Sequence, residues 1–290
     1  MGRDGPLGRP NLPLRFWPSF IALDQKNEPT PLRTAQRSVP TPLMTNQPLH
    51  DRIALVTGAG RGLGRELALA YAAAGASVIC TARTQSELDQ TRAAITAAGG
   101  QAHAFACDAT DEQQTAAFFA TLTQQFDRLD IVFLNAGGAE GDERPIAESD
   151  YAAWKRIVDM NLSTAFLMAR DCLPLLRLGT DPKIITMGSG LGKTPRIGAS
   201  AYGCGKAALS LFTKALAMEL LPEGITVNEL IPGPVGTDPD SFEPHYVEEG
   251  TFKGEYFKEP ADIIPLAMFL ATQPSHGPSG QTFSLNRRLL

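Results

Sequence analysis

The stretch that decides the fold of this chain reads Thr57-Gly58-Ala59-Gly60-Arg61-Gly62-Leu63-Gly64. An apolar run at 52–56 precedes it, and a helix-like segment at 65–74 follows it. Glycine permits tight turns and close backbone approach, so a glycine-rich turn between a strand and a helix is typical of a dinucleotide-binding loop. The start of the following helix offers unpaired N–H groups and the positive end of a dipole to a pyrophosphate. We therefore expect a dinucleotide site here.

Strand-like and helix-like segments alternate from Arg52 to the end of the chain. The expected strands are 52–56, 76–81, 101–107, 130–134, 183–187, 226–230 and 281–285. The expected helices are 65–74, 84–98, 111–126, 149–176, 201–221 and 261–270. This alternation predicts an α/β fold, a single doubly wound domain whose seven-stranded parallel sheet carries helices on both faces. The ligand is expected beyond the carboxyl ends of the strands.

Composition and charge narrow the class of protein. The 290 residues are 43% hydrophobic and 20% charged, as in an ordinary soluble protein, and the net charge of −5 does not favour a nucleic-acid partner. No apolar run approaches the roughly 20 residues that cross a bilayer, so no membrane partner is expected. The four scattered cysteines form no Cys-x-x-Cys pair, which favours free thiols in a reducing, cytoplasmic location and no metal site.

The first 50 residues differ from the remainder. Nine of the 22 prolines fall there, and no strand or helix periodicity persists between them. We expect a disordered, proline-rich leader at 1–50, followed by the catalytic domain at 51–290. Two alternatives stay open: a transit peptide, which its prolines and acidic residues oppose, or a true start at Met44. Intact-mass measurement of the native protein distinguishes them, since an N-terminus upstream of Met44 contradicts the second.

Three polar residues indicate a chemistry at the strand ends. Ser189 follows the strand at 183–187, and Tyr202 and Lys206 stand four residues apart on one face of the next helix. A phenol normally ionises near pH 10, but a neighbouring ammonium favours its anion, and a drop of about 3 units corresponds to roughly 4 kcal/mol. Tyr202 would then act as general acid/base for carbonyl–alcohol interconversion, with Ser189 bonded to the reacting oxygen.

With the glycine loop, these residues make the chain resemble the classical short-chain dehydrogenases/reductases from about residue 52 to 286. The Thr-Gly-x-x-x-Gly-x-Gly loop of that family is found at 57–64, its Asn-Ala-Gly segment at 135–137 and its Pro-Gly-x-Val-x-Thr segment at 232–237. Its catalytic tetrad matches Asn161, Ser189, Tyr202 and Lys206. The resemblance implies a Rossmann-fold oxidoreductase with a nicotinamide cofactor, acting on a small carbonyl or alcohol and assembling as a homodimer or homotetramer through the helices at 149–176 and 201–221.

The same resemblance implies roles for individual residues. Asn161 would support a water in a proton relay with Lys206, and Lys206 would also bind the nicotinamide ribose hydroxyls. Asp108 would meet the adenine ring, although it could instead cap the following helix. Substrate contacts are expected from Ser189, Gly190 and Tyr202. Cofactor contacts are expected from Thr57, Gly58, Arg61, Gly62, Leu63, Gly64, Arg83, Asp108, Ala109, Asn135, Ala136, Gly137, Tyr202, Lys206, Pro232, Gly233, Val235 and Thr237.

The tip of the second strand indicates which cofactor is used. Enzymes that use NAD place a carboxylate there to hold the adenosine ribose. Here the segment 80–84 has no carboxylate, and Arg83 suits a 2′-phosphate as a planar cationic donor. Arg61 would add a second positive charge. The alternative is that Arg83 only begins the next helix, but its positive charge would then lie at the positive end of the helix dipole, which is unfavourable. We expect NADP(H) to be preferred, with NAD(H) still possible.

Two other functions compete with a reductase of ketones, 3-oxoacyl groups or other small carbonyls. A serine hydrolase would need Gly-x-Ser-x-Gly, but Met187 takes the place of the first glycine and no histidine is placed as a base. A non-catalytic NADPH-binding sensor would be indicated by loss of Tyr202 or Lys206, and both are present. The loop at 236–258 is expected to shape the substrate pocket, and its acidic residues disfavour a highly anionic substrate.

Overall fold

Seven parallel strands form the central sheet, in the order β3-β2-β1-β4-β5-β6-β9. The computed structural model describes residues 47–139, 144–236, 242–250 and 252–288. The strands are β1 (Ile53–Thr57), β2 (Ser77–Ala82), β3 (Gln101–Ala106), β4 (Ile131–Leu134), β5 (Lys183–Met187), β6 (Thr226–Ile231) and β9 (Thr282–Ser284). The helices are α1 (Gly62–Ala73), α2 (Gln85–Ala97), α3 (Glu112–Gln125), α4 (Tyr151–Leu176), α5 (Ser200–Leu220) and α6 (Ile264–Ala271).

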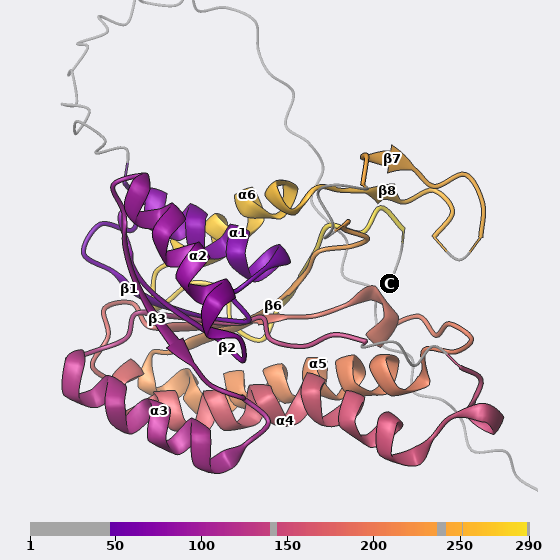
Figure 1. Ribbon diagram of the computed structural model, residues 1–290, viewed down its shortest axis with the longest axis horizontal. Coiled ribbons are helices and arrows are strands. Elements are labelled where there is room, and N and C mark those ends of the chain that lie inside the picture. Colours follow the sequence, from indigo (N-terminus) through magenta and orange to yellow (C-terminus); the bar gives the residue numbers. More distant parts are fainter. Residues whose placement is uncertain (1–46, 140–143, 237–241, 251, 289–290) are drawn as a thin grey trace, which may run out of the picture. The chain divides into compact units, whose positions relative to one another are not determined.

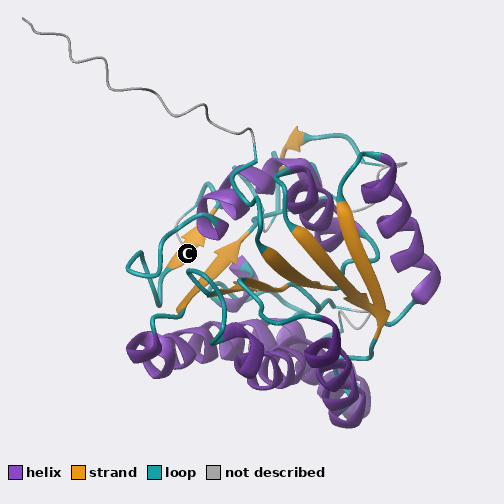
Figure 2. Ribbon diagram, turned by 90° about the vertical axis from the view of Figure 1, so that its left-hand side faces the viewer, coloured by secondary structure: helices purple, strands orange, loops and turns teal. Residues whose placement is uncertain are grey.

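Two layers of helices enclose the sheet. Helices α1, α2 and α6 cover one face and α3, α4 and α5 cover the other (Figure 1), and Figure 2 shows the twisted strands between them. Because both faces are covered, the central strands are apolar runs rather than alternating ones, and every residue of β4 and β6 is buried. The doubly wound prediction is confirmed. The chain winds in opposite directions from β1 and β4, so their carboxyl ends form the switch point where ligands bind.

The element boundaries differ from the predicted ones in a few places. Helix α1 begins at Gly62, inside the glycine stretch, because the loop turns directly into the helix. The predicted loop at 236–258 contains a short antiparallel pair, β7 (His245–Tyr246) with β8 (Tyr256–Phe257). Strands of two residues have no periodicity to detect. The proposed domain boundary at 51 stays a prediction, and the leader up to residue 46 lies outside the described residues. Within the described ranges, no helix is long and apolar enough to cross a bilayer.

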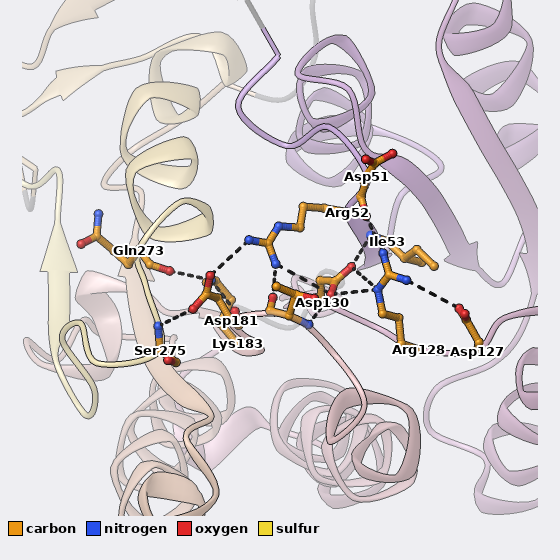
Figure 3. Close-up of polar contacts among 11 residues, drawn as sticks. Asp51, Arg52, Ile53, Asp127, Arg128, Asp130, Asp181, Lys183, Gln273 and Ser275 are labelled. Atoms are coloured by element: carbon orange, nitrogen blue, oxygen red, sulfur yellow. Dashed lines mark hydrogen bonds and ion pairs between the residues drawn. The ribbon is translucent and has the colours of Figure 1, made fainter. Parts of the chain in front are cut away.

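A buried carboxylate joins the amino ends of the central strands (Figure 3). Asp130, which is fully buried, accepts hydrogen bonds from Ile53 N at 2.8 Å and Thr180 N at 2.6 Å. The Arg128 Nε donates to the same carboxylate at 3.3 Å, and Arg52 lies within ion-pair distance of it. This cluster fixes the starts of β1, β4 and β5 relative to one another. It lies at the amino ends of the strands, whereas ligands bind at the carboxyl ends in this fold.

Replacing Asp130 with alanine should lower the free energy of unfolding by about 3 kcal/mol, because buried backbone donors and an arginine lose their acceptor. Urea denaturation, monitored by circular dichroism, measures this free energy of unfolding. The matched control is Asp127→Ala, since Asp127 pairs with Arg128 only at 3.9 Å and is 82% exposed. Equal midpoints for the two variants would contradict the structural role of Asp130.

Candidate active site

A cleft of about 630 Å³ opens at the carboxyl ends of the strands. Its walls come from the glycine loop, the tip of β2, the turns after β3, β4 and β6, the end of β5, and helices α4 and α5. The predicted site residues that line it are Thr57, Gly58, Arg61, Gly62, Leu63, Gly64, Arg83, Asp108, Ala109, Asn135, Ala136, Gly137, Tyr202, Lys206 and Pro232. Segments that are far apart in the sequence therefore meet where the topology predicts a ligand.

The glycine loop has the backbone that an anion-binding turn requires. Gly58 and Gly62 adopt positive φ angles of 67° and 54°, a region that other residues rarely enter. At Gly64 a Cβ atom would lie 2.1 Å from the Gly58 carbonyl oxygen, so no side chain fits there. Arg61, the N-cap residue of α1, makes no capping hydrogen bond with its side chain. The first residues of α1 line the cleft, which fits a dinucleotide whose pyrophosphate binds at a helix start.

Three side chains hold the glycine loop in place. The Thr57 hydroxyl accepts hydrogen bonds from the backbone N–H groups of Asn135 and Ala136, both at 2.9 Å. Asn135 Nδ2 donates to the Thr57 carbonyl at 2.9 Å, which ties the loops after β1 and β4 together. On the far side, the buried Thr91 hydroxyl of α2 donates to the Ala59 carbonyl at 3.0 Å. Thr91 was not predicted, because a threonine inside a helix belongs to no motif.

At the adenosine end, the cleft wall carries two arginines and one carboxylate. Arg61 and Arg83 are exposed on the cleft wall. Glu87, one turn into α2, also lines the cleft, and a Cβ atom on Gly60 would lie 2.8 Å from its Oε2. Glu87 was not predicted, because it stands on α2 and not at the strand tip where a ribose-binding carboxylate is expected. The Thr81 hydroxyl is buried on this wall and has no hydrogen-bond partner among the described residues, which leaves a polar atom for a ligand.

Asp108 does not cap the helix that follows it. Its carboxylate accepts from the backbone N–H and the hydroxyl of Thr110, at 3.0 and 2.7 Å. Helix α3 is capped by Asp111, which accepts from Gln113 N and Gln114 N. The capping alternative is therefore wrong, and Asp108 remains on the cleft wall beside Ala109.

The predicted catalytic residues converge at the other end of the cleft. Ser189 hydrogen-bonds to Tyr202, and the Lys206 Nζ lies 5.8 Å from the centroid of the Tyr202 ring. Lys206 is buried, and its Nζ donates to the Met187 carbonyl at 2.7 Å. A Cβ atom on Gly137 would lie 3.3 Å from that nitrogen. The structure thus gathers a hydroxyl, a phenol and an ammonium beside the turn after β4.

Asn161 lies directly behind this group. Its amide nitrogen donates to the Gly138 carbonyl at 2.7 Å and to the Ile157 carbonyl at 2.8 Å. Its Oδ1 accepts from Gly138 N at 3.1 Å and would lie 2.7 Å from a Cβ atom on Gly137. The side chain therefore joins α4 to the turn after β4, although it is not part of the cleft wall.

The direction of the Tyr202 pKa shift differs from the prediction. Burial raises the pKa of the Tyr202 phenol, and the Ser189 hydrogen bond, which lowers it, is the smaller effect. Burial also lowers the pKa of Lys206 to about 8, because an ammonium is costly to bury. The lysine donates to a carbonyl rather than to the phenol, so the predicted lowering of the tyrosine pKa is wrong for the ligand-free protein.

The remaining predicted residues lie around this end. Gly190 is buried and begins a short 3₁₀ turn, where the Ser189 hydroxyl accepts from Leu191 N at 3.2 Å. Gly233 has a positive φ of 72°, and a Cβ atom there would lie 2.9 Å from Lys258 Nζ. Val235 forms an isolated bridge with Lys258. Thr237 lies outside the described residues.

The fold and the site together define a dinucleotide-binding α/β protein with a cluster of polar side chains at one end of its cleft. Residues 52–244 match the family model described as short chain dehydrogenase. A 3-oxoacyl-[acyl-carrier-protein] reductase of Synechocystis sp. is 30% identical over 81% of this chain and 95% of its own. The 7alpha-hydroxysteroid dehydrogenase of Escherichia coli is 29% identical over 83% and 95%. A Shigella flexneri short chain dehydrogenase crystallised with NADP superposes with a TM-score of 0.73, at 30% identity over 82% and 98%.

The chain therefore belongs to the short-chain dehydrogenase/reductase family. It is an oxidoreductase with the Rossmann fold that the sequence predicted, and its cleft binds a nicotinamide dinucleotide. The glycine loop, the start of α1 and the unpartnered Thr81 hydroxyl fit such a cofactor.

Proposed function

We propose that this protein is an NADP(H)-dependent oxidoreductase that interconverts a carbonyl and a secondary alcohol, with Tyr202 as general acid/base. The observation that carries the proposal is the convergence of Ser189, Tyr202 and Lys206 at one end of a dinucleotide cleft. A phenol and a hydroxyl that bond to each other can also bond together to a single carbonyl oxygen. The other acidic group at that end, the Lys206 ammonium, already donates to the Met187 carbonyl.

The chain's residues would divide the chemistry among them. A bound nicotinamide supplies or accepts the hydride. In the reducing direction the Tyr202 phenol donates its proton to the oxygen of the new alcohol, while the Ser189 hydroxyl holds that oxygen in place. Lys206 balances the phenolate charge left behind, and Asn161 fixes the adjacent turn. The raised Tyr202 pKa keeps the phenol protonated at neutral pH, which suits reduction.

The preference for NADP(H) rests on the adenosine end of the cleft. Arg61 and Arg83 present two guanidinium groups where a 2′-phosphate would need cationic donors. Glu87 is the opposing charge, but it stands one turn into α2 rather than at the tip of β2. The NADP complex of the Shigella flexneri relative supports the same choice. NAD(H) remains the weaker cofactor.

Arg83→Ala should weaken NADPH binding by about tenfold, because one charge-assisted contact to the phosphate is lost. NADH binding should change little, since that cofactor has no 2′-phosphate. Fluorescence titration of both cofactors measures the two dissociation constants. Arg65→Ala is the control, because Arg65 pairs with Glu66 and is not part of the cleft wall. An unchanged NADPH constant in Arg83→Ala would refute the assignment.

The substrate class is a small-molecule ketone or 3-oxoacyl compound, supported by the reductase and hydroxysteroid dehydrogenase relatives. The test is a panel of such carbonyls with NADPH oxidation as readout. Turnover of at least one ketone is expected. Tight NADPH binding without oxidation across the panel would instead indicate a cofactor-binding sensor of the same fold.

Assembly as a homodimer or homotetramer is supported by apolar side chains on the outer helices. Phe166 of α4 is 47% exposed, and Leu211 and Met218 of α5 are 70% and 77% exposed. Such a surface is typical of a subunit contact, and light scattering measures the resulting mass. A cytoplasmic location is supported by the buried free thiols of Cys80, Cys107 and Cys172, which suit a reducing compartment.

A further inference from the structure

A carboxylate is buried on β6, one strand in from the edge strand β9, next to Gly188, which directly precedes Ser189. Glu229 of β6 is 2% exposed, whereas charged residues seldom occupy such positions unpaired. Its Oε2 accepts hydrogen bonds from the Ser210 hydroxyl at 2.9 Å and the Thr282 hydroxyl at 2.7 Å. The Lys193 Nζ lies 3.6 Å from the same oxygen. Its Oε1 has no hydrogen-bond partner among the described residues.

This carboxylate contacts both ends of the segment that carries Ser189. On one side, a Cβ atom on Gly188 would lie 2.3 Å from Glu229 Oε1, so only glycine fits directly before the serine. On the other side, Lys193 follows the 3₁₀ turn that begins after Ser189. Ser210 joins the two, because its hydroxyl also accepts a hydrogen bond from Lys193 Nζ. The position of the serine thus depends on Glu229.

The same carboxylate acts on the catalytic lysine. Ser210 lies one helical turn after Lys206 on the same face of α5, and it donates a hydrogen bond to Glu229. Its charge raises the pKa of Lys206, which opposes the lowering by burial. Tyr202 on α5 and Asn161 on α4, which lie beside Lys206, are uncharged at neutral pH. The cation paired with Glu229 is Lys193.

Stability alone does not explain a carboxylate here. Burying an ion costs several kcal/mol, and a buried ion pair is often no more stable than apolar residues of similar size. An oxygen without a partner adds to that cost. A charge kept at such a cost beside a reaction centre is a candidate for a functional role.

We propose that Glu229 is a positioning residue: its carboxylate, paired with Lys193, fixes the segment bearing Ser189 and sustains the positive charge on Lys206. The inference rests on the proposed function, because it concerns the same reaction centre. It extends that function to a residue of β6 that lies outside the cleft wall. Its distinguishing consequence is electrostatic, since the charges of Glu229 and Lys193 act on Lys206 with opposite sign.

The test is a direct titration of Lys206 in the ligand-free protein by NMR of ¹³C-labelled lysine side chains. The Lys206 signal is assigned by its loss in Lys206→Met. In the wild type its pKa is expected near 8. Glu229→Gln should lower that pKa by about one unit because a nearby negative charge is lost. Lys193→Gln should raise it, and the double variant should return it toward the wild-type value.

Ser210→Ala is the matched control, because it removes a hydrogen bond to Glu229 and no charge. Its Lys206 titration should stay within a few tenths of a unit of the wild type. If Glu229→Gln does not fold, Lys193→Gln still decides the question, since Lys193 is 24% exposed. A Lys206 titration that does not move in the charge variants would overturn the inference.

The second readout is the pH profile of ketone reduction. Its apparent pKa should follow the same order, lowest in Glu229→Gln and highest in Lys193→Gln. A purely structural role would lower turnover in each variant without moving the profile, and would contradict the proposal. Wild-type protein without turnover would overturn the proposed function instead, while the NMR titration would still report on Lys206.

Discussion

Tyr202→Phe should lower kcat for ketone reduction by about a thousandfold, because the hydroxyl that donates the proton to the reacting oxygen is removed. The substitution keeps the ring, so the packing against Lys206 and the Lys206–Met187 hydrogen bond should persist. The dissociation constant for NADPH should therefore change by less than about threefold. Steady-state turnover and fluorescence titration of NADPH measure the two quantities separately.

The matched control is Tyr71→Phe. Tyr71 is fully buried on α1, bonds to the Ala267 carbonyl at 3.4 Å, and has no part in the cleft wall. Its loss of a hydroxyl should leave turnover nearly unchanged. If Tyr202→Phe retained turnover, the proton donor would have to be another group, and the proposed mechanism would fail.

The second large effect is expected at the glycine loop, where Gly64→Ala should weaken NADPH binding by about a hundredfold. The new methyl group would lie 2.1 Å from the Gly58 carbonyl oxygen and 2.6 Å from Asn135 Nδ2. A backbone oxygen cannot move without displacing the loop, so about 3 kcal/mol of binding free energy should be lost. Isothermal titration calorimetry measures it.

Gly99→Ala separates this effect from a general loss of stability. Gly99 has a φ of 83°, and nothing lies within 4 Å of the position of its Cβ atom. An alanine there strains the backbone away from the cleft, so the thermal midpoint should fall while NADPH affinity stays the same. Similar NADPH affinities for Gly64→Ala and the wild type would contradict the assignment of the loop.

Much of the fold was predictable from the sequence because its signals are local. Apolar runs between glycine turns mark the buried strands, and the spacing of Tyr202 and Lys206 places both on one helix face. Residues that reach the cleft from inside a helix, such as Glu87 and Thr91, leave no comparable signal. That Asp111 caps α3, and Asp108 does not, also depends on the folded backbone.

Other properties depend on burial and on distant neighbours. The Tyr202 pKa moves opposite to the prediction because burial of the phenol is a property of the assembled fold. The prediction that the loop at 236–258 disfavours a highly anionic substrate rests only on the loop's own acidic residues. In the structure the guanidinium groups of Arg196 and Arg288 lie 5.8 and 5.3 Å from the Phe252 ring, and that of Arg287 lies 5.2 Å from Tyr246. The local charge is therefore mixed.

The Asp130 cluster has a consequence for protein engineering. It holds the sheet together at the amino ends of the strands, whereas the cofactor cleft lies at their carboxyl ends. The residues that stabilise the fold there are therefore separate from those that line the cleft. Many enzymes lose activity when they are made more heat-resistant, because the same residues determine both stability and activity. Here directed evolution can strengthen the amino ends of the strands first and then use the gained tolerance to diversify the substrate-facing loops.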